Sequence, residues 1–399
     1  MHRTLCVPTD AARVVRAMAT RRGSGCCTRR RFLGGLTALL STGVAAACGP
    51  ARGQPAPPAA VSTAEAAATA SRLPAAAATV PVKVGLQNNA NDVGYHLAAE
   101  RGYYRREGLD VELAPFSNAS EMVPSLATGQ LQVSSAGANP ATLNGVGRGV
   151  RFKMVLGKGS FRPGYGFMAL VIRTAVWNDG RGRSLDALRG LRVAITPPGK
   201  ATTSAIPLDT ALRRVGATID DVEIVPLPFP EMVAALANGA VDGAIAQEPL
   251  VTRVVQEGTA VKLMGLDEMY PDFSLSVVCF SPSFYADRPA AKAFARAYVQ
   301  ALRDYNAALA QPADDPRRHE VNALIARFTR IPLETVEQMT PVGLSPNGGF
   351  NVQSVLDAYH WFLGQGMLAQ PLDEAELQDL LGTELLDEVL NEIGRLPES

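Results

Sequence analysis

Beyond residue 48 the 399-residue chain has a single cysteine, Cys279, and the whole chain has only four histidines. A lone cysteine cannot form an intramolecular disulfide bond, and scattered histidines do not make a metal pair. Cys279 lies in the apolar run 276–280, which predicts a buried strand, so we expect a small core residue rather than a nucleophile. We therefore predict no metal site and no cofactor.

Residues 48–399 also lack an excess of positive charge. The chain has 38 Lys and Arg against 38 Asp and Glu, but residues 1–47 contain eight of the arginines and only one aspartate. The remaining 30 basic and 37 acidic side chains give residues 48–399 about seven negative charges. A nucleic-acid-binding protein needs clustered Lys and Arg to displace counterions from phosphates, so this class of function is excluded.

Sequence motifs of common active sites are missing as well. The serines, histidines and aspartates include no nucleophile elbow of the G-x-S-x-G type. The run Gly157 to Ser160 lacks the spacing of a Walker phosphate-binding loop. The composition, with 47% hydrophobic and 19% charged residues, is otherwise that of an ordinary globular protein.

The first 47 residues are typical of an export signal. Arg29 to Arg31 precede an uncharged run, Phe32 to Ala47, which is too short to anchor stably in a bilayer of about 30 Å. Consecutive arginines followed by Phe-Leu resemble a twin-arginine signal, with the general secretory route as the alternative. Met1 and Met18 are both possible starts.

The signal ends in Ala45-Ala46-Ala47-Cys48, which resembles a bacterial lipobox, although Ala45 stands where Leu is more usual. Lipidation of Cys48 would tether the protein to the outer face of the cytoplasmic membrane, and the alternative is cleavage and release into the periplasm. Residues 48–80 are rich in Ala and Pro, cannot bury a core and predict a disordered tether. We expect an exported monomer.

From Pro81 onward, short apolar runs alternate with helical patterns. Val82–Leu86 and Leu191–Ile195 predict strands, and Tyr95–Arg106 predicts a helix. This alternation is typical of mostly parallel sheets covered by helices on both faces, and it predicts two α/β lobes. The C-terminal part is mainly helical, and one of its predicted helices is Glu374–Ile393.

We place lobe 1 at residues 81–173 and 274–399, and lobe 2 at residues 174–273. The crossings between the lobes are expected near Ile172–Trp177 and Tyr270–Leu275.

Polar side chains follow the predicted strands, where ligands bind in open α/β sheets. The candidate ligand-binding residues are Asn88, Asp92, Tyr95, His96, Asn118, Asn139, Ser160, Lys200, Thr202, Thr203 and Glu248. Residues 200–204 begin a predicted helix whose free N–H groups favour an anion, unless Thr202 or Thr203 only caps it. Glu248 either accepts a hydrogen bond from a ligand amine or caps the next helix. Local turn and cap chemistry is the alternative for Asn118 and Asn139, and His96 can equally be a polar helix residue.

Five motifs in order resemble those of one protein family. They are ERGYYRREGLDVE at 100–112, LATGQLQV at 126–133, LDALRGLRV at 185–193, DDVEIVPL at 220–227 and ALANGAVDGAIAQEP at 235–249. The chain departs from the family pattern at Gln132, where Asp is usual, and at Gln247, where an aromatic residue or Thr is usual. On these motifs the chain resembles the solute-binding proteins of bacterial ABC importers for nitrate, sulfonate, taurine and thiamine precursors.

The resemblance implies a two-lobed, periplasmic-binding-protein-like fold of the type II venus-flytrap class, with C-terminal helices. It implies capture of a small organic anion or zwitterion between the lobes and delivery to an ABC permease with its ATPase subunits. A pyrimidine or aromatic-acid binding protein and a stand-alone sensor subunit are the alternatives. Yeast thiamine-pyrimidine synthases share this fold but use a cysteine-rich iron motif that residues 81–399 lack, so we expect no enzyme.

Overall fold

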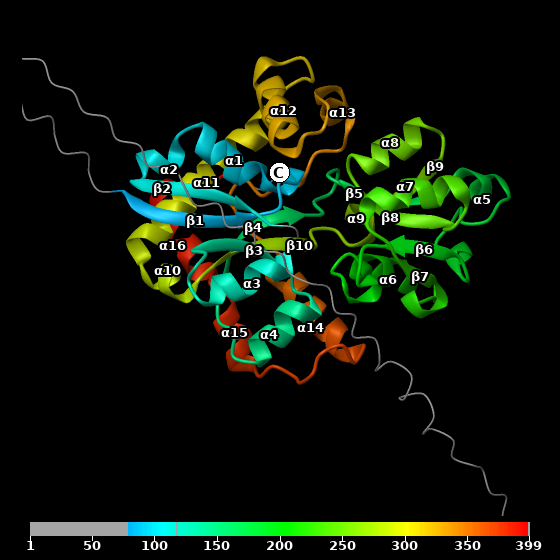
Figure 1. The fold of residues 1–399 in the computed structure, drawn as a ribbon, viewed down its shortest axis with the longest axis horizontal. Helices are drawn as coiled ribbons and strands as arrows, with labels where there is room; N and C mark the ends of the chain where they lie inside the picture. The colour runs from blue at the N-terminus through cyan, green and yellow to red at the C-terminus, as the bar shows by residue number, and fades with distance from the viewer. Residues whose placement is uncertain (1–78, 117–118, 398–399) are drawn as a thin grey trace, which may run out of the picture. The chain divides into compact units, whose positions relative to one another are not determined.

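The computed structural model describes residues 79–116 and 119–397. The predictions for the signal, for Cys48 and for Asn118 lie outside the described residues. The described part contains two five-stranded sheets, with strand orders β2-β1-β3-β10-β4 and β7-β6-β8-β5-β9, and helices pack on both (Figure 1). The predicted α/β fold class is therefore confirmed.

Each sheet mixes parallel and antiparallel strands, whereas the sequence predicted mostly parallel ones. The first sheet consists of β1 (Val80–Leu86), β2 (Leu109–Pro115), β3 (Val133–Ala136), β4 (Lys153–Ser160) and β10 (Ser274–Phe280). The second consists of β5 (Met168–Arg173), β6 (Arg192–Ile195), β7 (Glu223–Pro226), β8 (Gly243–Gln247) and β9 (Ala260–Gly265). β10 runs antiparallel to β3 and β4, and β5 runs antiparallel to β8 and β9. In each sheet the strand that follows a crossing runs against its neighbours.

The chain passes from the first sheet to the second between Ser160 and Met168 and returns between Gly265 and Ser274. The first crossing therefore precedes the predicted one near Ile172–Trp177. The physical reason is that Met168–Arg173 is an apolar, almost fully buried strand inside the second sheet rather than a connection. The return segment overlaps the predicted second crossing.

Helices pack on both sheets. Those of the first are α1 (Val93–Glu100), α2 (Tyr103–Arg106), α3 (Ala119–Ala127), α4 (Pro140–Gly147), α10 (Pro282–Ala286), α11 (Arg288–Leu309), α12 (Pro316–Thr329), α13 (Leu333–Gln338), α14 (Val352–Gly364), α15 (Glu374–Leu380) and α16 (Thr383–Ile393). Those of the second are α5 (Thr174–Asn178), α6 (Ala205–Arg213), α7 (Phe229–Asn238), α8 (Leu250–Gln256) and α9 (Leu266–Met269). Two short 3-10 turns matter below: η1 (Ala90–Asp92) and η3 (Gly199–Ala201).

Two helices predicted as continuous are each divided in two. Tyr95–Arg106 breaks because Gly102 adopts a left-handed conformation with φ of 69°, which favours glycine. Glu374–Ile393 breaks at Leu381, which is extended and forms a bridge with Met154 of β4. In both places a local backbone demand overrides the helical pattern.

The longest helix of the described residues, α11, builds much of the core beside the first sheet. It packs on α1, where Tyr298 faces Tyr95 with ring centroids 5.2 Å apart. Cys279 of β10 is fully buried, and burial raises the pKa of its thiol well above the ordinary value, as expected for an inert core residue. Among the described helices, none is both long and apolar enough to cross a membrane.

Candidate functional site

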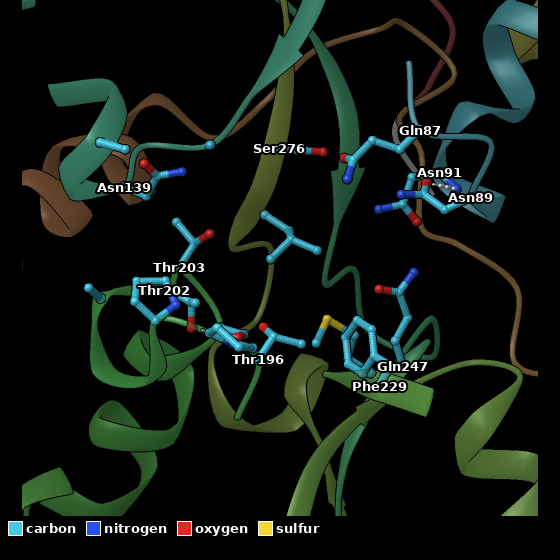
Figure 2. Close-up of a pocket in the computed structure, with 18 of the residues that line it drawn as sticks. Gln87, Asn89, Asn91, Asn139, Thr196, Thr202, Thr203, Phe229, Gln247 and Ser276 are labelled. Carbon is cyan, nitrogen blue, oxygen red and sulfur yellow. Dashed lines mark hydrogen bonds between the residues drawn. The ribbon is translucent and has the colours of Figure 1, made fainter. Parts of the chain in front are cut away.

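Residues from both sheets line one cavity of about 400 Å³, a volume within the usual range of small-molecule sites (Figure 2). The lining residues from the first sheet and its connections are Gln87, Asn89, Asn91, Gly137, Asn139, Pro140, Ala141, Lys158, Leu275 and Ser276. Those from the second are Met168, Thr196, Pro197, Pro198, Ala201, Thr202, Thr203, Ser204, Phe229 and Gln247. Several follow the carboxyl ends of β1, β3, β6 and β8, which is where open α/β sheets bind ligands.

Asparagine side chains of the first sheet both cap turns and line the cavity. Asn89 caps η1, because its Oδ1 accepts a hydrogen bond from the Asn91 backbone N–H at 3.1 Å. Asn139 caps α4 in the same way, accepting from the Thr142 N–H at 3.0 Å. Asn91 itself is 4% exposed, and its Oδ1 has no partner among the described residues. Buried polar atoms normally have partners, so this oxygen is available to a ligand.

A buried ion pair lies at the same side of the cavity. Lys158 Nζ is 2.9 Å from Asp92 Oδ1, with the two side chains 2% and 0% exposed. Asp92 Oδ2 accepts hydrogen bonds from the backbone N–H groups of Gln87 and Asn89, both at 3.1 Å. The pair satisfies the rule that a buried charge needs a partner and hydrogen bonds, and it fixes the only charged side chain among the described lining residues.

The second sheet contributes mainly hydroxyl groups and apolar contact surface. Thr202 Oγ1 donates to the Gly199 carbonyl at 2.9 Å and lies 3.1 Å from Ser204 Oγ, so this loop is held by its own side chains. Figure 2 shows Thr202 and Thr203 on the same side of the cavity as Asn139, with Gln247 on the side of Asn89 and Asn91. Thr203 and Asn139 both approach Gly137, since a Cβ there would lie 3.2 Å from Thr203 Oγ1 and 3.7 Å from Asn139 Nδ2.

Three of the predicted site residues, Asn139, Thr202 and Thr203, line this cavity together. Asp92 pairs with Lys158 and Lys200 pairs with Asp220, and neither Asp92 nor Lys200 is among the lining residues. Their predicted contact with a ligand stays a prediction.

Four other predicted site residues contact residues that do not line the cavity. Tyr95 is fully buried against Tyr298, and Ser160 Oγ donates to the Gly343 carbonyl at 3.3 Å. His96 Nε2 is 3.1 Å from Asn88 Oδ1, and its ring stacks on Phe328 at a centroid distance of 3.9 Å. Burial lowers the pKa of His96, partly offset by the negative charge of Asp92.

Glu248 joins elements of the two sheets. Its Oε2 accepts a hydrogen bond from Thr252 N at 2.9 Å, and its Oε1 accepts one from Thr340 N at 3.1 Å. A second such contact joins α14 to α6, where Trp361 Nε1 donates to Asp209 Oδ2 at 2.7 Å. These contacts give Glu248 a capping role, and its contact with a ligand amine stays a prediction.

The sequence pattern did not single out Asn89, Asn91, Phe229 or Ser276. The first two belong to a polar run after β1 that the sequence marks as a group, but only the backbone decides which members face the cavity. Asn88, at φ of 54°, turns the chain so that its side chain meets His96 while its neighbours line the cavity. Ser276 lies inside β10, where no turn signal marks it.

Solved structures of other proteins share this fold. The periplasmic nitrate-binding protein NrtA from Synechocystis PCC 6803 has a TM-score of 0.63 at 14% identity, covering 79% of this chain and 89% of that one. The periplasmic aliphatic sulphonate-binding protein SsuA from Escherichia coli has a TM-score of 0.60 at 16% identity, covering 76% and 92%. The fold is the two-lobed α/β fold of periplasmic solute-binding proteins.

The sequence gives the family. Residues 75–317 match the model of the NMT1-like family, and the chain belongs to that family. It is also 25% identical over 257 residues to the taurine-binding periplasmic protein of Escherichia coli K12, covering 64% of this chain and 75% of that protein. The resemblance to nitrate, sulfonate and taurine solute-binding proteins is thus confirmed.

Proposed function

We propose that the protein is the extracytoplasmic solute-binding component of an ABC importer. It captures a small organic anion or zwitterion in the cavity between its sheets and delivers it unchanged to the permease and ATPase subunits. The observation that carries the proposal is the cavity itself, which takes about half of its lining from each sheet. A solute in this position contacts both halves at once, so its binding favours the closed arrangement over an open one.

The chemistry of the lining supports binding rather than conversion. The described lining residues are mostly amides, hydroxyls and apolar groups, and they include no Cys, His, Asp or Glu that would act as nucleophile or general base. Lys158, the one titratable group, is held by Asp92. These groups orient a solute by hydrogen bonds without a route for proton transfer, so we propose that the protein is not an enzyme.

A pyrimidine or aromatic acid is the second candidate solute. Phe229 and Met168 give the cavity an apolar surface, and Gln247 lines the same cavity (Figure 2). An aromatic face and an amide in one cavity suit a flat ring with polar edges.

The location follows from the relatives and from the sequence. Relatives named as periplasmic support export, and we propose a twin-arginine signal, lipidation at Cys48 and a monomer tethered to the outer face of the cytoplasmic membrane. Palmitate labelling in a bacterial host, lost in Cys48→Ala, tests the anchor.

A thermal-shift screen of the purified full-length chain tests the main proposal. The compounds are sulfonates, nitrate, bicarbonate, pyrimidines and aromatic acids, and a true solute at a hundred times its Kd adds about 2.7 kcal/mol of stability. Thr203→Ala should weaken the shift, while Thr210→Ala, on the same segment but outside the cavity, should not. The proposal would be contradicted if Thr203→Ala left the thermal shifts of all binding compounds unchanged. Recovery of a compound in chemically altered form would also contradict it.

A further inference from the structure

We propose that the solute carries an anionic group and an uncharged polar group, but no ammonium group. This inference rests on the proposed function and narrows it, because a small organic anion and a zwitterion are otherwise equally compatible with a protein of this family. It depends on the charges that line the two sides of the cavity.

The side formed by Asn89, Asn91 and Gln247 has no negative charge to receive an ammonium group. None of the described lining residues is Asp or Glu. The two acids nearest in sequence, Asp92 and Glu248, each use both carboxylate oxygens: Asp92 on Lys158 and two backbone N–H groups, Glu248 on two backbone N–H groups.

A ligand ammonium group would instead meet a second cation. Lys158 lines the cavity and is 1% exposed; its ionic partner, Asp92, offsets its charge but already uses both carboxylate oxygens, so the pair offers no acceptor to an added ammonium group. Amide oxygens can accept hydrogen bonds from an ammonium or from a hydroxyl group, but only the ammonium adds a positive charge beside Lys158. The unpartnered Oδ1 of Asn91 is therefore better matched by a neutral donor, such as a hydroxyl or amide N–H.

The opposite side suits an anion. The eight-residue helix α4 begins at the cavity with Pro140 and Ala141, where the partial positive charge of the helix N-terminus lies. Asn139 uses its Oδ1 as the cap, so the atom that it can offer to a solute is Nδ2, a donor. The Thr203 hydroxyl lies next to it. Among the described lining residues, this side of the cavity therefore offers hydrogen-bond donors and no carboxylate of the protein, so it favours a sulfonate or carboxylate group of the solute.

Three isosteric sulfonates provide the test: isethionate, propanesulfonate and taurine have similar chains that end in hydroxyl, methyl and ammonium groups. We expect the full-length chain to bind isethionate at least about tenfold more tightly than taurine in calorimetry, which equals about 1.4 kcal/mol. Hydroxypropionate against β-alanine repeats the comparison for carboxylates and shows which anionic group is preferred.

The variant Gln247→Glu sharpens the test because it places a carboxylate of nearly the same shape in the cavity. We expect the ratio of isethionate to taurine affinity to fall at least about tenfold in this variant. Gln378→Glu, an exposed substitution of the same kind on α15, should leave the ratio unchanged. The wild-type ratio decides the proposal even where Gln247→Glu does not fold.

Tighter or equal binding of taurine by the wild type overturns this inference and leaves the proposed function intact. Binding of neutral pyrimidines alone, with no anion bound, also overturns the inference while preserving a solute-binding role. If no compound of any class binds, both the inference and the proposed function fail.

Discussion

The two sides of the cavity are built differently, although each contributes about half of the lining. On the first sheet, Asn89, Asn139 and Lys158 line the cavity and also hold their own backbone through caps and a buried ion pair. On the second sheet, Thr202 also holds its own loop, but Thr196, Thr203 and Gln247 line the cavity without a side-chain hydrogen bond to another described residue. The first side therefore couples recognition to folding at most of its polar positions, whereas Thr196, Thr203 and Gln247 on the second side can vary with the solute at less cost to stability.

The largest expected effect concerns the buried ion pair. Asp92→Asn leaves the Lys158 ammonium buried without its counter-charge, so we expect the free energy of unfolding to fall by about 3–5 kcal/mol. Urea denaturation measures it. Asp220→Asn removes the carboxylate from the Lys200–Asp220 ion pair, which is more exposed. It should lower the free energy of unfolding by less than about 1 kcal/mol. Equal costs for the two variants would mean that the pair next to the cavity has no special role in stability.

A matched pair of substitutions tests the comparison within the cavity. Asn139→Ala removes the cap of α4, so it should lower the free energy of unfolding by about 1 kcal/mol and also weaken solute binding. Thr203→Val keeps the shape of the side chain and removes only a hydroxyl group. It should weaken binding by about two- to tenfold with stability unchanged to within about 0.5 kcal/mol.

Calorimetry with the best solute and urea denaturation of both variants give these numbers. The comparison between the two sides breaks down if Thr203→Val destabilises the fold as much as Asn139→Ala does.

The smallest expected effect is a pH dependence outside the cavity. Because burial lowers the pKa of His96, the unfolded chain takes up a proton at this site more readily, below its ordinary pKa of about 6.5. The contribution of the neutral His96 ring to stability is therefore fully present above that pH. It is lost as the pH falls through the lower pKa that His96 has in the folded state.

We expect the stability difference between wild type and His96→Gln to shift against the wild type, by less than about 1 kcal/mol, between pH about 8 and about 5. Urea titrations at the two pH values measure it. A shift in favour of the wild type at low pH would show that the negative charge of Asp92 outweighs burial at this ring.

The fold could largely be predicted from the sequence, because short apolar runs and ordered motifs depend on local pattern. β5 was missed because the end of its apolar run overlaps the crossing expected near Ile172–Trp177, even though Pro163-Gly164 before it is a turn signal. Within the site, Asn139 lies just after β3, and Thr202 and Thr203 lie just before α6, so their position at the cavity could be foreseen. The place of Asn91 and the bond between Glu248 and Thr340 could not, because the first depends on a left-handed Asn88 and the second joins residues 92 positions apart.

The bond from Trp361 to Asp209 has a practical consequence. The chain contains two tryptophans, and this one places its indole N–H on a carboxylate that belongs to the opposite sheet's helices. Separation of α14 from α6 would expose that indole to water and change its emission. A Trp177→Phe background would leave Trp361 as the single tryptophan, so any movement of α14 relative to α6 could be followed by selective tryptophan excitation in stopped-flow experiments without any attached dye.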